Sequence, residues 1–98
     1  MGVQVNRADI LDTAKEYVTK DRAATHGDAE RNFGLIAAYW SAHLDATVTS
    51  HDVAVMMALF KLARMKSNPA HIDSAQDLCG YAAIAGEIGA AYAERKVD

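Results

Sequence analysis

The fold is decided by residues 51–66, which read HDVAVMMALFKLARMK. Each residue of an α-helix turns the chain by about 100°. The apolar side chains of this segment then point in nearly every direction around the axis: Val53, Val55, Met56, Met57, Leu59, Phe60, Leu62 and Met65. A helix that is apolar on all sides is buried on all sides. Because a chain of 98 residues has little material with which to surround it, we expect a homo-oligomer to complete the fold.

Three further helical patterns surround this segment. Residues 7–22 follow a plausible N-cap at Asn6, residues 28–44 carry an apolar face, and residues 73–95 are lined with alanine and glycine. Glycines inside the last pattern indicate close approach by another helix. The polar connector at residues 45–50 reads as a loop whose hydroxyls cap the following helix. The sequence therefore predicts one all-α domain over residues 1–98, with four helices, a buried apolar third helix and a flexible N-terminus at residues 1–6.

Composition and charge narrow the function classes. Hydrophobic residues make up 51% of the chain and charged residues 23%, which is typical of a globular protein. No apolar run reaches the length of a membrane span, and a net charge of −3 argues against general nucleic-acid binding. The single cysteine, Cys79, cannot form an internal disulfide, so we expect a reducing cytoplasm, that of the host if a phage encodes the protein.

Two carboxylates at the start of the last helix form the first candidate site. Asp73 and Asp77 are spaced i,i+4, so they lie on one helix face and repel one another. A hard cation such as Mg²⁺ would relieve this repulsion, and so would ion pairs with Lys61 and Arg64. The alternative is structural, with Asp73 capping the helix and Asp77 solvated in its first turn.

The second candidate is the sequence His26-Gly27-Asp28, followed one turn later by Asn32. Gly27 permits a tight turn, and free N–H groups at the start of a helix can seat a phosphate. A metal ion held by Asp28 would reconcile that carboxylate with an anionic ligand. The alternative is an ordinary turn with Asp28 as N-cap and Asn32 on the surface.

Lys61 and Arg64 form the third candidate, because their i,i+3 spacing projects them together from an otherwise apolar helix. Cations in that setting need partners, which can be the carboxylates of the last helix, the phosphates of a ligand, or water at the rim. The sequence leaves an ion-pair network and a ligand-assisted version of it equally open.

These motifs resemble those of a family of small phage- and prophage-encoded proteins catalogued as a domain of unknown function. The resemblance covers residues 15–90 and rests on an ordered series of motifs: His26-Gly27-Asp28, Asn32-Phe33, Trp40, the run from Asp52 to Met57 with Lys61 and Arg64, and Asp73 with Asp77 before Gly80-Tyr81. More loosely, the chain resembles the all-α MazG-like nucleoside triphosphate pyrophosphohydrolases, which hold Mg²⁺ between carboxylates of neighbouring helices. Unlike them, it has no ExxE pair on the earlier helix, and its later pair is spaced i,i+4.

The resemblance and the charge pattern together lead to a nucleotide-binding protein of phage type. If it is an enzyme, it is a Mg²⁺-dependent pyrophosphohydrolase; whether it turns over a nucleotide stays open. The predicted metal ligands are Asp73, Asp77 and Asp28, the predicted substrate-binding residues are Lys61, Arg64 and Asn32, and the predicted catalytic residue is His26. The alternative is a non-catalytic accessory protein that sequesters a nucleotide signal or inhibits a host protein.

Overall fold

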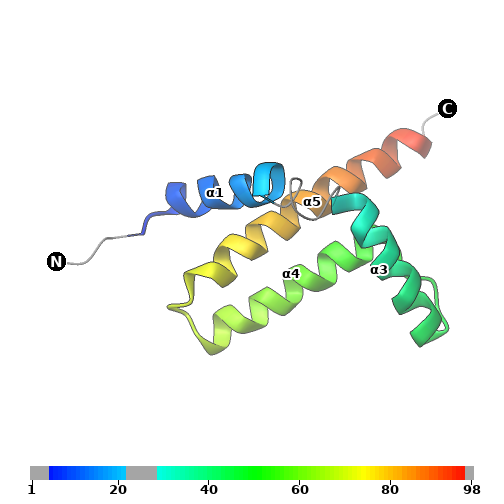
Figure 1. Cartoon of the computed structure of the whole chain (residues 1–98), viewed down its shortest axis with the longest axis horizontal. Helices are drawn as coiled ribbons and strands as arrows, with labels where there is room; N and C mark the ends of the chain where they lie inside the picture. The colour runs from blue at the N-terminus through cyan, green and yellow to red at the C-terminus, as the bar shows by residue number, and fades with distance from the viewer. Residues whose placement is uncertain (1–4, 22–28, 97–98) are drawn as a thin grey trace.

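Helices make up nearly all of the chain that the structure describes. The computed structural model describes residues 5–21 and 29–96, which contain no strand. The elements are α1 (Arg7–Glu16), a π-helical turn η1 (Tyr17–Asp21), α3 (Ala29–Leu44), α4 (Ser50–Ser67) and α5 (Ile72–Lys96) (Figure 1). The all-α class and the four helical patterns are therefore confirmed, with η1 continuing α1.

Two helices begin with side-chain caps that the sequence encodes locally. The Asn6 side chain accepts a hydrogen bond from the Asp9 backbone N–H at 2.9 Å. At α4 the Asp52 N–H donates to the Thr49 hydroxyl at 3.1 Å, and the Thr49 N–H donates to the Asp52 carboxylate at 2.9 Å. This reciprocal capping box satisfies two N–H groups that the helix itself leaves without partners. It confirms that the hydroxyl-rich end of the connector starts α4.

The connector between α3 and α4 is a loop, as predicted. Asp45 ends α3 with a positive φ of 52°, the left-handed conformation that commonly follows a helix. The Ser41 hydroxyl then accepts from the Val48 N–H at 2.8 Å and donates to the Val48 carbonyl at 3.1 Å. These bonds tie the loop back onto α3, so the chain enters α4 at a defined position.

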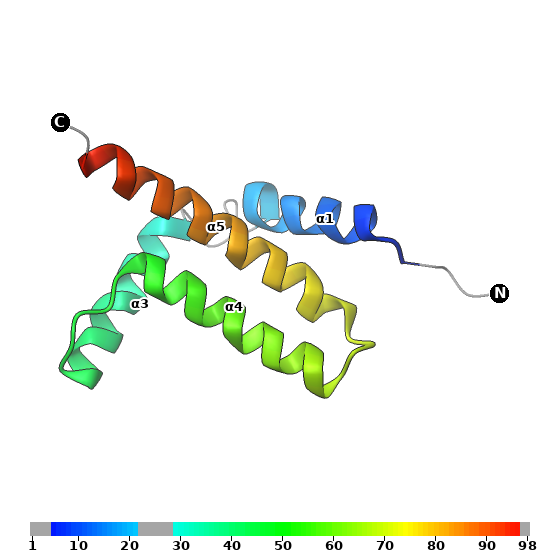
Figure 2. The same cartoon turned by 180° about the vertical axis from the view of Figure 1, so that it is seen from behind.

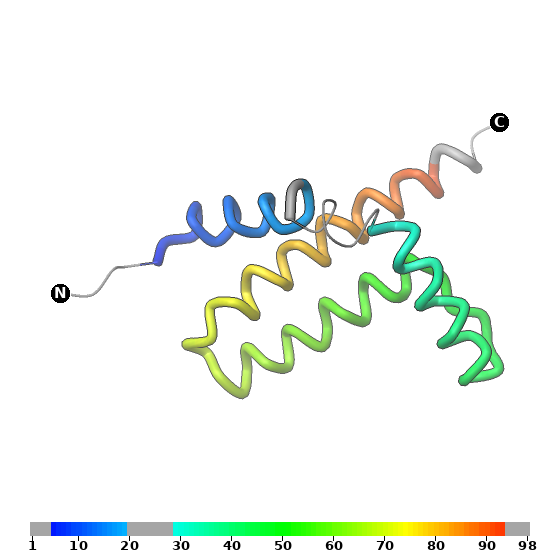
Figure 3. The backbone as a smooth tube through the Cα atoms, in the orientation of Figure 1, coloured from blue at the N-terminus to red at the C-terminus, as the bar shows by residue number. Residues whose placement is uncertain are grey.

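The helices are arranged around α5, which lies between α1 and α4 (Figures 1 and 2). The backbone trace shows α4 and α5 running side by side in opposite directions, joined by a short connector (Figure 3). The remaining helix, α3, packs against α4 near the end where α4 begins (Figure 1). This arrangement is elongated, with extents of 54 × 29 × 27 Å and a radius of gyration of 15.1 Å, whereas about 13 Å is usual for a compact domain of this length.

The core between these helices is built largely from small side chains. Its buried members come from α3, α4 and α5: Phe33, Ala37, Val53, Ala54 and Ala85. Two of the α5 glycines allow the close approach predicted for them. A Cβ on Gly80 would lie 3.1 Å from the Val18 side chain, and one on Gly89 would lie 3.5 Å from the His51 ring. Gly86 has no such neighbour within 4 Å.

The apolar helix α4 is buried only on the side that faces α3 and α5. Val53 and Ala54 are fully buried there. The opposite side, here called the outer face of α4, is exposed and carries only apolar residues: Val55, Met56, Leu59, Phe60, Leu62 and Ala63. The sequence predicts that this helix is buried on all sides, whereas a single chain buries only its inner side.

Two further expectations concern the ends of the chain and membranes. Residues 1–4 of the predicted flexible N-terminus lie outside the described residues, while Val5 and Asn6 are exposed. In the described part of the chain, no helix combines the length and apolarity that crossing a membrane requires.

Candidate functional site

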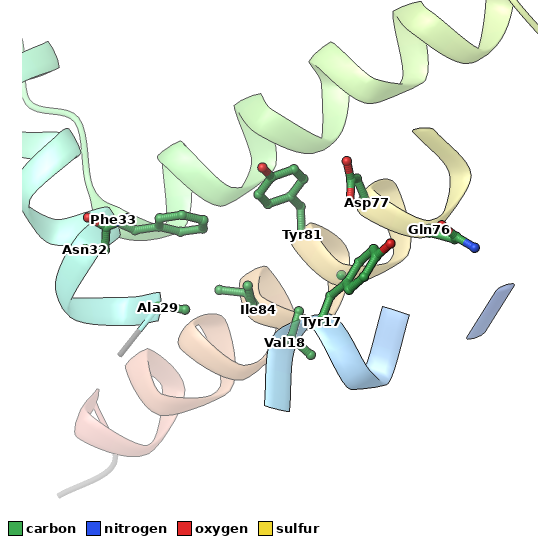
Figure 4. A pocket seen from close by; sticks show the side chains of 10 residues that line it. Tyr17, Val18, Ala29, Asn32, Phe33, Gln76, Asp77, Tyr81 and Ile84 are labelled. Carbon is green, nitrogen blue, oxygen red and sulfur yellow. The ribbon is translucent and has the colours of Figure 1, made fainter. Parts of the chain in front are cut away.

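A cavity lies between η1, α3 and α5. Its volume is about 150 Å³. The side chains that line it are Tyr17, Val18, Ala29, Asn32, Phe33, Gln76, Asp77, Tyr81 and Ile84, together with the backbone of Gly80 (Figure 4). We call this the α3–α5 cavity.

One part of the cavity wall is aromatic and aliphatic. The rings of Phe33 on α3 and Tyr81 on α5 have centroids 6.0 Å apart and are tilted by 33°, within the range of favourable aromatic pairs. Ile84 lies one turn beyond Tyr81 on α5, and Val18 approaches from η1 (Figure 4). The absence of a side chain on Gly80 lets Val18 come this close. A flat apolar ring is the natural complement of such a wall.

The strongest polar feature of the cavity is the carboxylate of Asp77. It is 9% exposed, and its Oδ2 accepts from the Lys61 ammonium of α4 at 2.9 Å. Lys61 is itself only 16% exposed, so the pair is held in a medium that screens charge less than water does. The antiparallel α4–α5 packing brings these two residues together from positions 16 apart in the sequence. Lys61, from the predicted pair of cations, therefore forms an ion pair with Asp77, from the predicted pair of carboxylates.

The remaining members of those pairs do not join this contact. Asp73 is exposed in the first turn of α5, where a carboxylate favours the helix dipole. Arg64 is exposed and lies with its Cζ 6.0 Å from the centre of the Phe60 ring, while the Lys61 Nζ lies 5.7 Å from the same centre. These distances are typical of cation–π contacts. The predicted network is thus reduced to a single Lys61–Asp77 ion pair.

The second candidate site falls partly outside the described residues. His26 and Asp28 lie there, so the structure does not place the predicted catalytic residue or the third predicted metal ligand. Asn32 is described, and it lines the α3–α5 cavity near Phe33 (Figure 4). Of the predicted site residues, the cavity therefore brings together Asn32 and Asp77, with Lys61 behind Asp77.

The carboxylates of the described residues do not form a metal cluster. Within those residues, no three His, Cys, Asp or Glu side chains gather closely enough to hold a metal ion. Asp77 already has a cation, and Asp73 faces solvent. The described residues thus fit a Mg²⁺ site poorly, and the predicted site stays a prediction.

Sequence reasoning did not select three of the polar residues that line the cavity: Tyr17, Gln76 and Tyr81. Tyr17 lies among apolar residues of the pattern at residues 7–22, and such a position does not reveal a role for its hydroxyl. The available signal was the spacing of Asp77, Gly80 and Ile84 along one stripe of α5. A carboxylate followed by glycine on a mainly buried stripe indicates a polar contact beside a close approach, which here are Lys61 and the Val18 side chain.

The volume and the lining of the cavity suit one small ring with hydrogen-bonding groups at its edge. A cavity of this size holds one six-membered aromatic ring, with Phe33, Tyr81 and Ile84 as apolar contacts. Three lining side chains carry amide or carboxylate groups, Asn32, Gln76 and Asp77. Figure 4 shows the Gln76 amide pointing away from the aromatic wall and Asn32 at the opposite end, beyond Phe33, so Asp77 is the nearest of the three to Tyr81. Binding sites of this kind combine an apolar lining with a few placed polar groups.

Comparison with known proteins identifies relatives but no activity. A family model described as a domain of unknown function (DUF6378) matches residues 9–89. The Gene 55 protein of Mycobacterium phage L5 is 43% identical over 76 residues, covering 76% of this chain and 49% of that protein. The Gene 55 protein of Mycobacterium phage D29 is 37% identical over 73 residues, covering 74% of this chain and 48% of that protein. The chain thus spans about half the length of these relatives. No solved structure matches it significantly.

Proposed function

The chain belongs to the phage protein family defined by this domain of unknown function, DUF6378, and from that premise we propose that it binds a nucleoside or nucleotide through its base. The observation that carries the proposal is the α3–α5 cavity, with an aromatic wall and a carboxylate held in place by Lys61. The base enters the cavity, and the sugar and any phosphates stay outside.

The polar groups suit the edge of a base. A base carries ring N–H or amino donors next to carbonyl or ring-nitrogen acceptors. Asp77 accepts from such donors, and it lies beside Tyr81 in the cavity wall (Figure 4). Because the Lys61 contact fixes the Asp77 carboxylate, little side-chain entropy is lost when a ligand binds it. The volume of about 150 Å³ favours a single-ring base over a double-ring base.

Binding without turnover is the form of the proposal that the geometry supports best. Pyrophosphohydrolysis of the MazG-like kind needs carboxylates free to hold a metal. Among the described residues Asp77 is paired with Lys61, and Asp73 does not line the cavity. We therefore favour a protein that sequesters its ligand. Hydrolysis and Mg²⁺ dependence are separate predictions that the same experiment tests.

The experiment is a thermal-shift panel of pyrimidine and purine nucleosides and nucleotides, each with Mg²⁺ and with EDTA. A ligand at 100 times its dissociation constant stabilises the folded state by about 2.7 kcal/mol, which raises the Tm of a small domain by about 10 °C. We expect pyrimidine ligands to give the larger shift and EDTA to leave it unchanged. Loss of the shift in EDTA, or pyrophosphate release from a triphosphate, would instead support the metal-dependent enzyme.

A matched pair of variants ties any shift to the cavity. Ala29 lines the cavity at the start of α3, whereas Ala38 is exposed on the same helix. Ala29→Leu fills the cavity and should remove the shift, while Ala38→Leu should keep it. A panel in which no nucleoside or nucleotide changes the Tm, or in which both variants behave alike, contradicts the proposal.

A further inference from the structure

The outer face of α4 exposes large apolar side chains over two helical turns. Phe60 is 51% exposed and Leu59 is 58% exposed. From Leu62 to Phe60 the face covers about 160° of the helix circumference, and no charged residue lies on it between Val55 and Ala63. A contiguous apolar surface of this kind marks an interaction site.

No helix in the described residues 5–21 and 29–96 covers this face. Both views of the ribbon show α5 on the inner side of α4 and no described helix on the outer side (Figures 1 and 2). The accessible surface is 7092 Å² for a mass of 10.6 kDa, whereas a compact monomer of that mass exposes about 5,500 Å². A standard interface hides about 800 Å² on each partner. The chain therefore exposes more surface than a compact monomer of its mass, by more than a standard interface hides on one partner.

The order of residues along this face is self-complementary. Asp52, Val55, Leu59, Leu62 and Lys66 follow one another at spacings of 3 and 4 residues, the pattern of a helix–helix seam. Asp52 and Lys66 both lie 7 residues from Leu59, one toward each end of α4. The apolar stretch is thus flanked by a negative charge on one side and a positive charge on the other.

We propose that a second copy of this chain occupies the outer face of α4, with the two α4 helices antiparallel about a two-fold axis at Leu59. A two-fold interface uses the same patch on both subunits. In this register Leu59 meets Leu59 of the partner subunit, and Val55 meets Ala63 of the partner subunit. Asp52 then meets Lys66 of the partner subunit, so opposite charges close both ends of the seam.

The proposal also accounts for the way α4 is built. The inner side of α4 packs on the small-residue core, and its outer side packs on the partner subunit. The helix, which is apolar on nearly every side, is therefore buried on all sides only in the dimer. Lys61 and Arg64 are no obstacle, because Lys61 points inward to Asp77 and Arg64 lies at the edge beside Phe60. The interface is separate from the α3–α5 cavity and does not depend on ligand binding.

Sedimentation equilibrium of the 98-residue chain tests the proposal. We expect about twice the subunit mass of 10.6 kDa. Leu59→Glu places two carboxylates against one another at the axis and should raise the dimer dissociation constant by about 100-fold or more. The matched control is Leu35→Glu, because Leu35 is an exposed leucine of α3, 53% exposed. Circular dichroism checks that both variants keep their helices.

The register has its own test, made in a Cys79→Ala background. Leu59→Cys should form an interchain disulfide with itself under mild oxidation. Val55→Cys and Ala63→Cys should cross-link to each other when mixed. Neither should cross-link to itself, since the axis separates each from its copy by about 12 Å. A native chain that stays monomeric at 0.5 mM, or a Leu59→Glu variant that dimerises as the native chain does, overturns the proposal and leaves a different protein as occupant. Self-cross-linking of Ala63→Cys overturns the antiparallel register.

Discussion

The two sides of α4 differ in the size of their apolar side chains, and the larger side chains lie on the exposed side rather than on the buried one. On the inner side, small residues and one ion pair face α5, and the fully buried residues of α4 are Val53 and Ala54. On the outer side, leucine, methionine and phenylalanine face solvent in a single chain. Large apolar side chains are normally the ones that fold into the core. The difference shows that α4 packs within the chain through its smaller apolar residues and leaves its larger ones exposed, which is the basis of the proposed dimer.

The largest effect should come from breaking the ion pair on the inner side. Asp77→Ala leaves the Lys61 ammonium largely buried without a partner, because Lys61 is only 16% exposed. We expect a loss of about 3 kcal/mol in the free energy of unfolding, measured by urea denaturation. Arg64 lies at the edge of the outer side, and Arg64→Ala should change the free energy of unfolding by less than about 0.5 kcal/mol.

A double variant distinguishes the contribution of the ion pair to stability from the contribution of the side-chain volume. Lys61→Met with Asp77→Leu replaces both charges with apolar groups of similar size, and its stability should lie within about 1 kcal/mol of the native value. If the double variant loses as much as Asp77→Ala alone, packing rather than the unpaired charge explains the loss.

A smaller effect should distinguish two valines of α4. Val53 is 0% exposed on the inner side and Val55 is 37% exposed on the outer face. Val53→Ala removes buried methyl groups and should cost about 2 kcal/mol. Val55→Ala should cost less than about 0.5 kcal/mol when the protein is dilute, and more at concentrations that favour the dimer. Equal losses for both valines at every concentration would contradict the contrast between the two sides.

The smallest effect concerns the cap at the start of α4 and depends on pH. Hydrogen bonds from the backbone and side chain of Thr49 lower the pKa of Asp52 below its ordinary value of 3.8. The folded state therefore favours the ionised carboxylate. The resulting stabilisation is fully present above about pH 4, and it is lost as the pH falls through the lower pKa of the folded state. Asp52→Asn should be less stable than the native chain at pH 7, and the difference should shrink in acid.

Thr49→Ala is the control for that pH dependence. It removes the hydroxyl that accepts from the Asp52 N–H, and it should cost about 1 kcal/mol. Most of that cost should persist across the acid range, because a hydroxyl does not titrate there. Urea denaturation of both variants between pH 3 and pH 7 makes the comparison. A difference between Asp52→Asn and the native chain that stays constant in acid would show that the carboxylate charge plays no part.

Local sequence signals predicted most of the fold. The periodic segments at residues 28–44, 51–66 and 73–95 correspond within a few residues to α3, α4 and α5. The caps at Asn6 and Thr49 were readable because each involves residues three positions apart. The loop predicted at residues 45–50 was readable from its polar residues and its hydroxyls, although Ser50 already belongs to α4.

The site was less predictable, since it depends on contacts between residues distant in sequence. The sequence left Asp73 and Asp77 equivalent, and only the packing of α4 on α5 selects Asp77 for Lys61. The aromatic pair of Phe33 and Tyr81 joins two helices whose crossing no local pattern specifies. The tyrosine hydroxyls of the cavity were hidden because an aromatic residue on an apolar stripe reads as core.

The sequence by itself determined that this protein is helical, where its helices lie to within a few residues, and that one helix is apolar on nearly every side. These features follow from backbone hydrogen bonds, caps and periodicity, which act over a few residues. The tertiary structure alone decided which carboxylate is paired, where a cavity remains, and which side of α4 is left exposed. Those outcomes depend on how small residues such as Gly80 let helices approach one another, because the distance between two helix axes is set by the side chains that meet between them.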